Sequence, residues 1–169
     1  MEVVILSDTH VTSRAPEIQG PVRGAMAGAD HVVHAGDFDS RPAHETVADL
    51  AAGFTAVRGN TDGNYGDLPE VATADLGGVR FVVTHGTGPE AGYEARVAAT
   101  VDEHAAADRP TVGVAGHTHT PLDTRVDGYR LLNPGSATGA WPARGATLMV
   151  AEADDGDLDV EVRSGETPG

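Results

Sequence analysis

The segment Val3-Val4-Ile5-Leu6-Ser7-Asp8-Thr9-His10 begins as an apolar run and ends in a carboxylate and an imidazole. Four consecutive aliphatic residues predict a strand that is buried on both faces. In an extended segment, residues i and i+2 point the same way, so we expect Asp8 and His10 to converge beyond the strand's carboxyl end. Open α/β sheets bind ligands at that edge. The segment therefore predicts a ligand site at one edge of a sheet.

The same construction recurs four times downstream, each time as an apolar strand that ends at a potential metal ligand. The predicted strands and their ligands are 31–35 with Asp37, 54–57 with Asn60, 79–83 with His85, and 111–115 with His117 and His119. One such motif alone is uninformative, because most Gly-Asp and Gly-Asn pairs are turns. Five motifs in order, all at strand ends, instead predict one shared site.

The remaining elements complete a single α/β domain over residues 1–169, whose polar tail from about residue 164 is expected to fray. We expect an irregular helix within 16–29 and regular helices over 41–52 and 90–107. Further strands are expected at 70–76, 122–126, 129–132, 145–151 and 158–162. Asp127-Gly128 predicts a hairpin. The four strands after residue 122 are expected to be antiparallel and to form a second sheet packed on the first.

The chain is strongly acidic, with a net charge of −15 from 26 acidic and 11 basic residues, all of the latter Arg. Such a surface repels phosphates, which argues against stable binding of duplex nucleic acid. An acidic, Lys-free composition resembles that of halophilic proteins, in which molar salt screens the self-repulsion. The alternative is a GC-rich genome, because Arg, Ala, Gly and Asp have GC-rich codons.

The sequence lacks membrane-spanning and signal segments, and it lacks cysteine. The first absence bears on localisation and the second on the possible metal ligands. No stretch approaches the roughly 18 apolar residues of a membrane span, and no basic segment with a cleavage site opens the chain. We therefore expect a cytoplasmic protein with no membrane partner. The chain also lacks Cys, which excludes disulfides and thiolate ligands. Carboxylate, amide and imidazole ligands suit Mn, Fe, Zn, Ni or Mg.

Seven strand-end ligands are too many for one ion and predict two divalent metal ions. The seven are Asp8, His10, Asp37, Asn60, His85, His117 and His119. With Asp37 as a bridge, the first ion takes Asp8, His10 and His119. The second ion takes Asn60, His85 and His117, and each shell keeps room for water.

These motifs also carry a resemblance. Asp8-x-His10, Gly36-Asp37, Gly59-Asn60, His85-Gly86 and Gly116-His117-Thr118-His119 resemble, in this order, the motifs of the calcineurin-like metallophosphoesterases. Their spacing, with Asn133-Pro134-Gly135-Ser136, resembles the small bacterial and archaeal phosphodiesterase branch. The resemblance covers about residues 1–150. It implies a four-layer αββα sandwich of two mixed sheets flanked by helices, a dinuclear site on the seven residues, and phosphoester hydrolysis.

We therefore predict a metal-dependent phosphodiesterase in which a metal-bridging hydroxide attacks a small phosphoester substrate. Asn60 and His117 are the predicted catalytic residues, because they would steady the phosphoryl group. Manganese is the first expectation for both ions, with nickel, iron, zinc, cobalt and magnesium as alternatives. No motif identifies residues that bind the organic part of the substrate, and homo-oligomerisation is left open.

One departure from the resembled family concerns the leaving group. Many members follow Gly-Asn with a His thought to protonate the leaving group, whereas this chain has Thr61 and then Asp62. A hydroxyl is a poor general acid, which favours diesters with good leaving groups over monoesters. Asp62 and His34 are the alternative proton donors, although His34 is also expected to pack within its strand. The alternatives for function are a phosphomonoesterase with the same site and a non-catalytic scaffold, the role of a retromer subunit with this fold.

The acidic composition generates a prediction about salt. Lowering KCl from molar to low concentration should lower the melting temperature, because unscreened repulsion among 26 acidic side chains opposes the compact state. The measurement needs excess divalent metal throughout, so that loss of bound ions is not mistaken for loss of screening. A melting temperature that does not depend on salt would contradict the halophilic interpretation.

Overall fold

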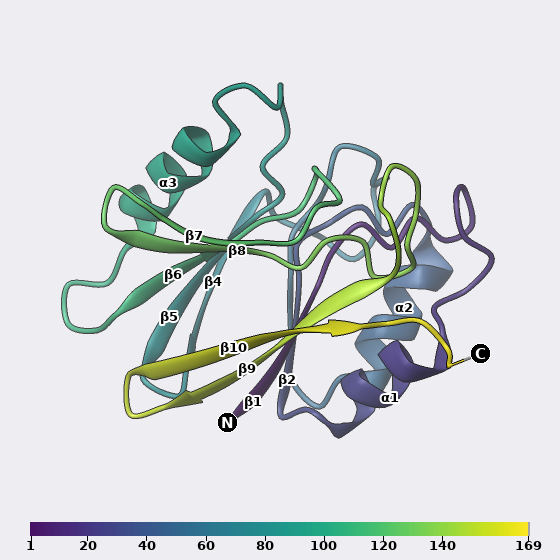
Figure 1. Cartoon of the computed structure of the whole chain (residues 1–169), viewed down its shortest axis with the longest axis horizontal. Coiled ribbons are helices and arrows are strands. Elements are labelled where there is room, and N and C mark those ends of the chain that lie inside the picture. The colour runs from purple at the N-terminus through teal and green to yellow at the C-terminus, as the bar shows by residue number, and fades with distance from the viewer. Residues whose placement is uncertain (169) are drawn as a thin grey trace.

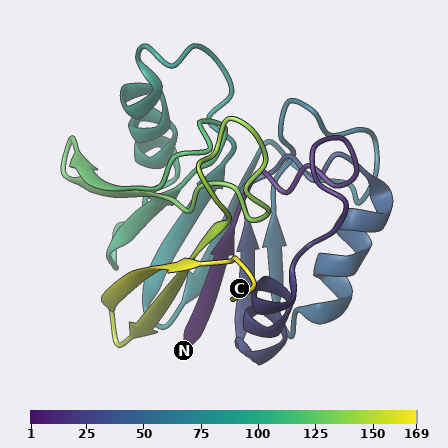
Figure 2. The same cartoon turned by 45° about the vertical axis from the view of Figure 1, so that its right-hand side comes forward.

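Two mixed sheets pack face to face in a computed structural model that describes residues 1–168 (Figure 1). In spatial order, the first sheet contains β10 (Asp157–Ser164), β9 (Thr147–Asp154), β1 (Glu2–Leu6), β2 (His31–His34) and β3 (Phe54–Ala56). The second contains β4 (Val71–Leu76), β5 (Val79–Thr84), β6 (Thr111–Val114), β8 (Tyr129–Asn133) and β7 (Leu122–Val126). Helices α1 (Gly20–Gly28) and α2 (Arg41–Leu50) cover the first sheet, and α3 (Tyr93–His104) covers the second (Figure 2). The predicted four-layer αββα sandwich is confirmed.

The opening strand shows how the sequence produces these layers. Val3 and Ile5 lie in the core between the sheets, where Phe81 of the second sheet is also fully buried. Val4 and Leu6 point the other way and pack in the core beneath α1 and α2. All four aliphatic residues are 0% exposed, as a strand covered on both faces requires.

The predicted membership of the second sheet is wrong. Strand β9 pairs antiparallel with β1, with Val150 opposite Val4, so β9 and β10 belong to the first sheet. Strand β8 pairs in parallel with β6, which places the β7–β8 hairpin in the second sheet. The hairpin at Asp127-Gly128 is confirmed. A hairpin signal specifies only the local pairing, whereas the buried strand beside it decides which sheet it joins.

The helices differ from their predicted form mainly at their ends. Helix α1 is regular, because Pro21 lies in its first turn, where the missing N–H would be unpaired in any case. Helix α2 begins after Ser40, whose hydroxyl accepts the Ala43 N–H at 3.3 Å. Helix α3 begins at Tyr93 and ends at His104, inside the predicted range. Among residues 1–168, none of the helices combines the length and apolar character needed to cross a membrane.

Parallel pairing brings the predicted ligands to one end of the molecule. Strands β1, β2 and β3 are mutually parallel in the first sheet, and β5 and β6 are parallel in the second. All five predicted ligand motifs follow the carboxyl ends of these strands. The sandwich therefore presents loops from both sheets to one shared region.

Candidate metal centre

Five of the seven predicted ligands have left-handed rather than extended backbone. Asp8 and His10 follow β1 with φ values of 52° and 47°, and Asp37, His117 and His119 have φ of 63°, 73° and 61°. Positive φ is rare outside Gly, and the surrounding structure must hold such residues in place. The prediction that strand alternation makes Asp8 and His10 converge is therefore wrong in its reason. The two side chains converge because both residues have left-handed backbone.

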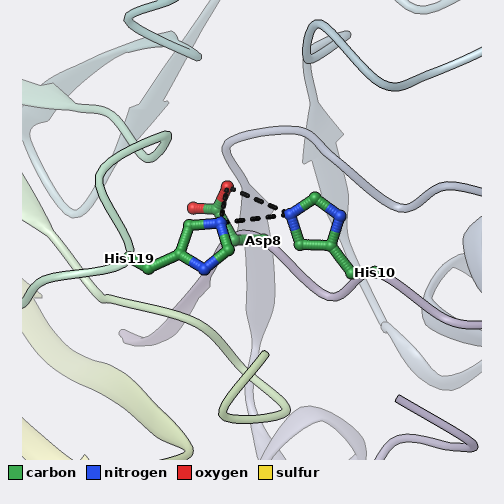
Figure 3. A group of neighbouring side chains, drawn as sticks. All are labelled: Asp8, His10 and His119. Atoms are coloured by element: carbon green, nitrogen blue, oxygen red, sulfur yellow. Dashed lines mark hydrogen bonds and ion pairs between the residues drawn. The ribbon is translucent and has the colours of Figure 1, made fainter. Parts of the chain in front are cut away.

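One cluster of buried side chains consists of Asp8, His10 and His119 (Figure 3). Asp8 Oδ1 lies 3.7 Å from His10 Nε2 and 3.3 Å from His119 Nε2. The two Nε2 atoms are only 3.1 Å apart. In Figure 3 the carboxylate and both rings point toward one another.

A second cluster, Asp8, Asp37 and His85, shares Asp8 with the first. His85 Nε2 lies 3.2 Å from Asp37 Oδ2 and 3.9 Å from Asp8 Oδ1. Asp37 Oδ2 is also 3.5 Å from His10 Nε2. Both carboxylates thus face imidazole nitrogens on two sides.

Hydrogen bonds on the outer side of each ring fix the tautomers of the three histidines in these clusters. Nδ1 of His10, His85 and His119 bonds, respectively, the Asp39 carboxylate at 2.9 Å, the Ala35 carbonyl at 2.6 Å and the Ala140 carbonyl at 2.9 Å. Carbonyl and carboxylate oxygens only accept, so each Nδ1 must donate. In their neutral form the rings would direct their Nε2 lone pairs into the cluster, as metal-binding histidines do.

The carboxylates are oriented in the same manner. Asp8 Oδ2 accepts the Ser7 hydroxyl at 2.7 Å and the His117 backbone N–H at 3.0 Å, whereas Oδ1 has no partner. His85 Nε2 is likewise buried without a hydrogen bond. A buried polar atom left unpaired costs about 1–3 kcal/mol. Oxygen and imidazole donors with unused lone pairs fit a divalent cation, so these residues could hold one.

Asn60 and His117 lie beside these clusters rather than within them. Asn60 Oδ1 is 3.1 Å from His117 Nδ1, and the His117 ring centroid is 5.2 Å from that of His85. His117 Nε2 donates to the Gly88 carbonyl at 2.9 Å. The structure therefore brings five of the seven predicted ligands into contact and places the other two at the rim next to His85.

Glycines in the predicted motifs allow two ligand loops to touch. A Cβ on Gly59 would lie 2.5 Å from the Asp37 backbone nitrogen. Gly36 has φ +98°, and a Cβ there would lie 2.6 Å from the Gly59 nitrogen. Only residues without a side chain fit at both positions.

Two carboxylates that hold the site together were not predicted in that role. Asp39 accepts from His10 and from the hydroxyls of Ser13 and Thr61. Asp62 accepts the Tyr65 hydroxyl and the backbone N–H groups of Asp37, Phe38, Asp39 and Gly59, the latter four at 2.8–3.1 Å. Their position in the sequence could have indicated this role, because each follows a predicted ligand by two residues.

The three candidate proton donors are all engaged elsewhere. Thr61 donates its hydroxyl proton to Asp39. His34 is fully buried and stacks on Phe38 with ring centroids 3.7 Å apart. Its Nδ1 accepts the Gly36 N–H, so its Nε2 donates to the Thr9 hydroxyl. Burial lowers the pKa of His34 to about 3, which keeps the ring neutral.

A model of the calcineurin-like phosphoesterase superfamily domain matches residues 1–156. The chain belongs to this superfamily. A probable metallophosphoesterase of Methanothermobacter thermautotrophicus is 31% identical over 163 residues, which cover 96% of this chain and 91% of that protein. A phosphodiesterase of Methanocaldococcus jannaschii is 26% identical over 153 residues, 82% of this chain and 86% of that protein.

Solved structures share the fold. Vps29 of Entamoeba histolytica complexed with zinc superposes with a TM-score of 0.75, at 23% identity over 98% of this chain and 100% of that chain. The fold therefore extends to a vacuolar sorting protein.

In the metal-free phosphoesterase, the carboxylates hold protons on the histidines. Burial alone would lower the pKa of His85, but the Asp37 carboxylate beside it and the charge of Asp8 raise it to about 9. The pKa of His10 is also raised, because the neighbouring carboxylates of Asp8 and Asp39 outweigh its burial. Burial would raise the pKa of Asp8, yet the imidazoles of His10, His119 and His85 around it hold it well below its usual range. The cluster therefore favours positive charge, as protons or as cations.

Metal binding should accordingly release protons at pH 7. His85, with a pKa of about 9, carries a proton that a cation must displace. The measurement is calorimetric titration of Mn²⁺ into metal-free protein in two buffers of different ionisation enthalpy. Metal affinity should rise with pH up to about 9, and the number of protons released should fall across that pH as His85 loses its proton before metal binds. Removing a histidine outside the site, with His31→Gln, should leave the number of protons unchanged, and absence of release at pH 7 would contradict the account.

Proposed function

We propose that this phosphoesterase hydrolyses phosphodiesters with two divalent cations, manganese first among them. One observation carries the proposal: Asp8 Oδ1 and His85 Nε2 are buried without partners in a cluster where two further Nε2 atoms face each other at 3.1 Å. Lone pairs pointed at one another repel unless a cation or proton lies between them. The proposed ligands are the seven predicted residues Asp8, His10, Asp37, Asn60, His85, His117 and His119.

The first proposed ion takes Asp8, His10 and His119, which form one of the two buried clusters. The second takes His85 with Asn60 and His117. His117 donates from Nε2 to Gly88, so in the neutral ring its Nδ1 is a bare lone pair 3.1 Å from the Asn60 oxygen. Two acceptors at that distance support a cation between them.

Asp37 is the proposed bridge between the ions. Its Oδ2 lies 3.5 Å from His10 Nε2 and 3.2 Å from His85 Nε2, so it faces a ligand of each ion. Its Oδ1 accepts the Thr61 N–H at 3.0 Å, which fixes the carboxylate in that orientation. Replacing Asp37 therefore affects both proposed ion sites at once.

The protein residues position the ester and its charges. When bound, a pair of divalent cations supplies an acidified water and neutralises the phosphate charge. Asn60 and His117 lie at the rim beside the second proposed ion. His117 would act on a phosphoryl group through that ion, whereas the Asn60 amide nitrogen, which makes no hydrogen bond within residues 1–168, can donate to it directly. Asp62 keeps the Asp37 and Asn60 loops in register through its backbone hydrogen bonds.

Diesters with good leaving groups are the proposed substrates. The hydroxyl proton of Thr61 is committed to Asp39, and His34 is neutral and enclosed, so neither supplies a proton to a poor leaving group. The similar Methanocaldococcus protein is named a phosphodiesterase, which supports this choice. A monoesterase would use the same ligands. A scaffold is the third candidate. The zinc complex of Vps29 shows that a sorting protein of this fold also binds metal, so only hydrolysis of an ester separates the two functions.

Hydrolysis rates should depend steeply on the pKa of the leaving group. Bis(4-nitrophenyl) phosphate should be cleaved faster than 4-nitrophenyl phosphate, and aryl diesters far faster than alkyl diesters. Thr61→His should raise rates for the poorest leaving groups most, within the roughly 10²–10⁴-fold range of general acid catalysis. Thr61→Ala is the matched control and should give no such gain. Wild-type rates independent of leaving-group pKa, while chemistry limits turnover, would show that another group donates the proton.

Asp37→Asn should abolish hydrolysis and reduce metal content from about two ions toward one or none, because the bridging charge is lost from both sites. Elemental analysis after gel filtration measures the content. The matched control is Asp49→Asn, since Asp49 is exposed on α2 and outside the site. Unchanged metal content in Asp37→Asn would overturn the bridging assignment.

A further inference from the structure

A cleft of about 550 Å³ adjoins the metal centre. Asn60 and His85 line it on the side of the proposed ions, and Arg58, Arg96 and Thr100 line it elsewhere. A group attached to the phosphorus at the metal centre would extend into this space. Its position next to the metal centre therefore makes the cleft a candidate substrate pocket. The charged side chains that line it indicate which chemical class of substrate it would bind.

Arg96 lacks the carboxylate partner that comparable arginines have. Four arginines are half-buried, and three of them pair with a carboxylate: Arg80 with Asp75 at 2.8 Å, Arg109 with Asp108 at 2.9 Å, and Arg130 with Asp123 at 2.8 Å. Within residues 1–168, Arg96 forms no ion pair, although the chain has 26 acidic residues. A half-buried charge without a counterion is unfavourable, and an anion in the cleft would supply one.

The Arg96 guanidinium is also held in place. Its Nη2 donates to the carbonyls of Gly86 and Pro89, both at 3.0 Å, while its Nε is buried and has no hydrogen-bond partner. A Cβ on Gly88 would lie 2.9 Å from the guanidinium carbon, so the loop lies directly against it. Because Nε is enclosed, the nitrogen left for an anion is Nη1, which makes no hydrogen bond within residues 1–168, and the group itself is preorganised.

Arg58 supplies a second positive charge that a ligand can recruit. Its pair with Glu70 spans 3.3 Å, and the two side chains are 45% and 82% exposed. Such exposed pairs contribute little, so exchange for a stronger anion is easy. Asp62 also lines the cleft, but its carboxylate is already taken up by four backbone N–H groups and the Tyr65 hydroxyl.

We propose that this cleft binds a second phosphate group of the substrate, separate from the scissile diester. The proposal rests on the proposed function, because it places the scissile phosphorus at the adjoining metal centre. Guanidinium groups bind phosphate through charge-assisted hydrogen bonds, and the cleft is lined by two of them, those of Arg58 and Arg96. The substrate class is therefore a phosphodiester that carries a further phosphate, as a phosphorylated nucleotide ester does.

A matched pair of chromogenic substrates tests the cleft. Thymidine 5′-(4-nitrophenyl phosphate) with and without a 3′-phosphate differ only in the distal group. The 3′-phosphorylated ester should have a KM lower by roughly tenfold in the metal-loaded wild-type protein, as expected for a hydrogen bond to a charged group. Arg96→Gln and Arg58→Gln should each reduce the ratio of the two KM values, that of the plain ester to that of the 3′-phosphorylated ester, toward one. The control Arg163→Gln removes an exposed arginine of β10 and should keep the ratio.

The ratio separates recognition from loop support. If Arg96 only holds the 86–89 loop, Arg96→Gln would impair both esters equally and leave the ratio unchanged, which would overturn its proposed role.

Binding without turnover separates this proposal from the proposed function. Calorimetry with metal-loaded protein at fixed salt should show thymidine 3′,5′-bisphosphate binding roughly tenfold tighter than thymidine 5′-monophosphate, with the advantage lost in Arg96→Gln. That result supports the cleft even if no diester is hydrolysed. Equal affinities for the two nucleotides, alongside normal diester hydrolysis, would overturn the cleft and leave the proposed function standing.

Discussion

The structure depends on one electrostatic constraint: two buried carboxylates and three imidazole lone pairs meet at a point where they repel unless positive charge lies among them. Asp8 and Asp37 come from the first sheet, and His85 and His119 follow strands of the second. The same cluster therefore joins the two halves of the sandwich. A cation bound there would stabilise the folded chain as well as serve chemistry, because it binds only where all these groups meet.

Much of the surrounding structure serves to hold that meeting point. Asp8, Asp37 and His119 have positive φ, and neighbouring contacts maintain this backbone. The Asp8 N–H donates to the Gly36 carbonyl at 3.0 Å and the His10 N–H to the Asp37 carbonyl at 3.1 Å, which ties the first loop to the second. Asp62 ties the second loop to the third. These hydrogen bonds join the three loops, so contacts within the chain itself hold the candidate ligands in place.

The strands and the ligand cluster could be predicted from the sequence, because both depend on patterns of neighbouring residues. A buried aliphatic run such as Val3 to Leu6 indicates a strand, and ligand residues directly after such runs indicate a shared edge. The sequence did not predict which sheet β9 joins, because β9 pairs with β1, a strand about 145 residues away. The role of Asp39 and Asp62 in holding the loops together was missed, because most of their partners lie on other loops. That Arg96 has no carboxylate partner can be recognised only from the structure, which gives the positions of the neighbouring carboxylates.

The central claim is that each chain holds two cations close enough to share Asp37. Electron paramagnetic resonance of the fully Mn²⁺-loaded protein, combined with elemental analysis, tests it most directly. The account predicts two ions per chain and an exchange-coupled spectrum, as ions about 3.5–4 Å apart give. One ion per chain at saturation, or two with the six-line spectrum of isolated Mn²⁺, would contradict it.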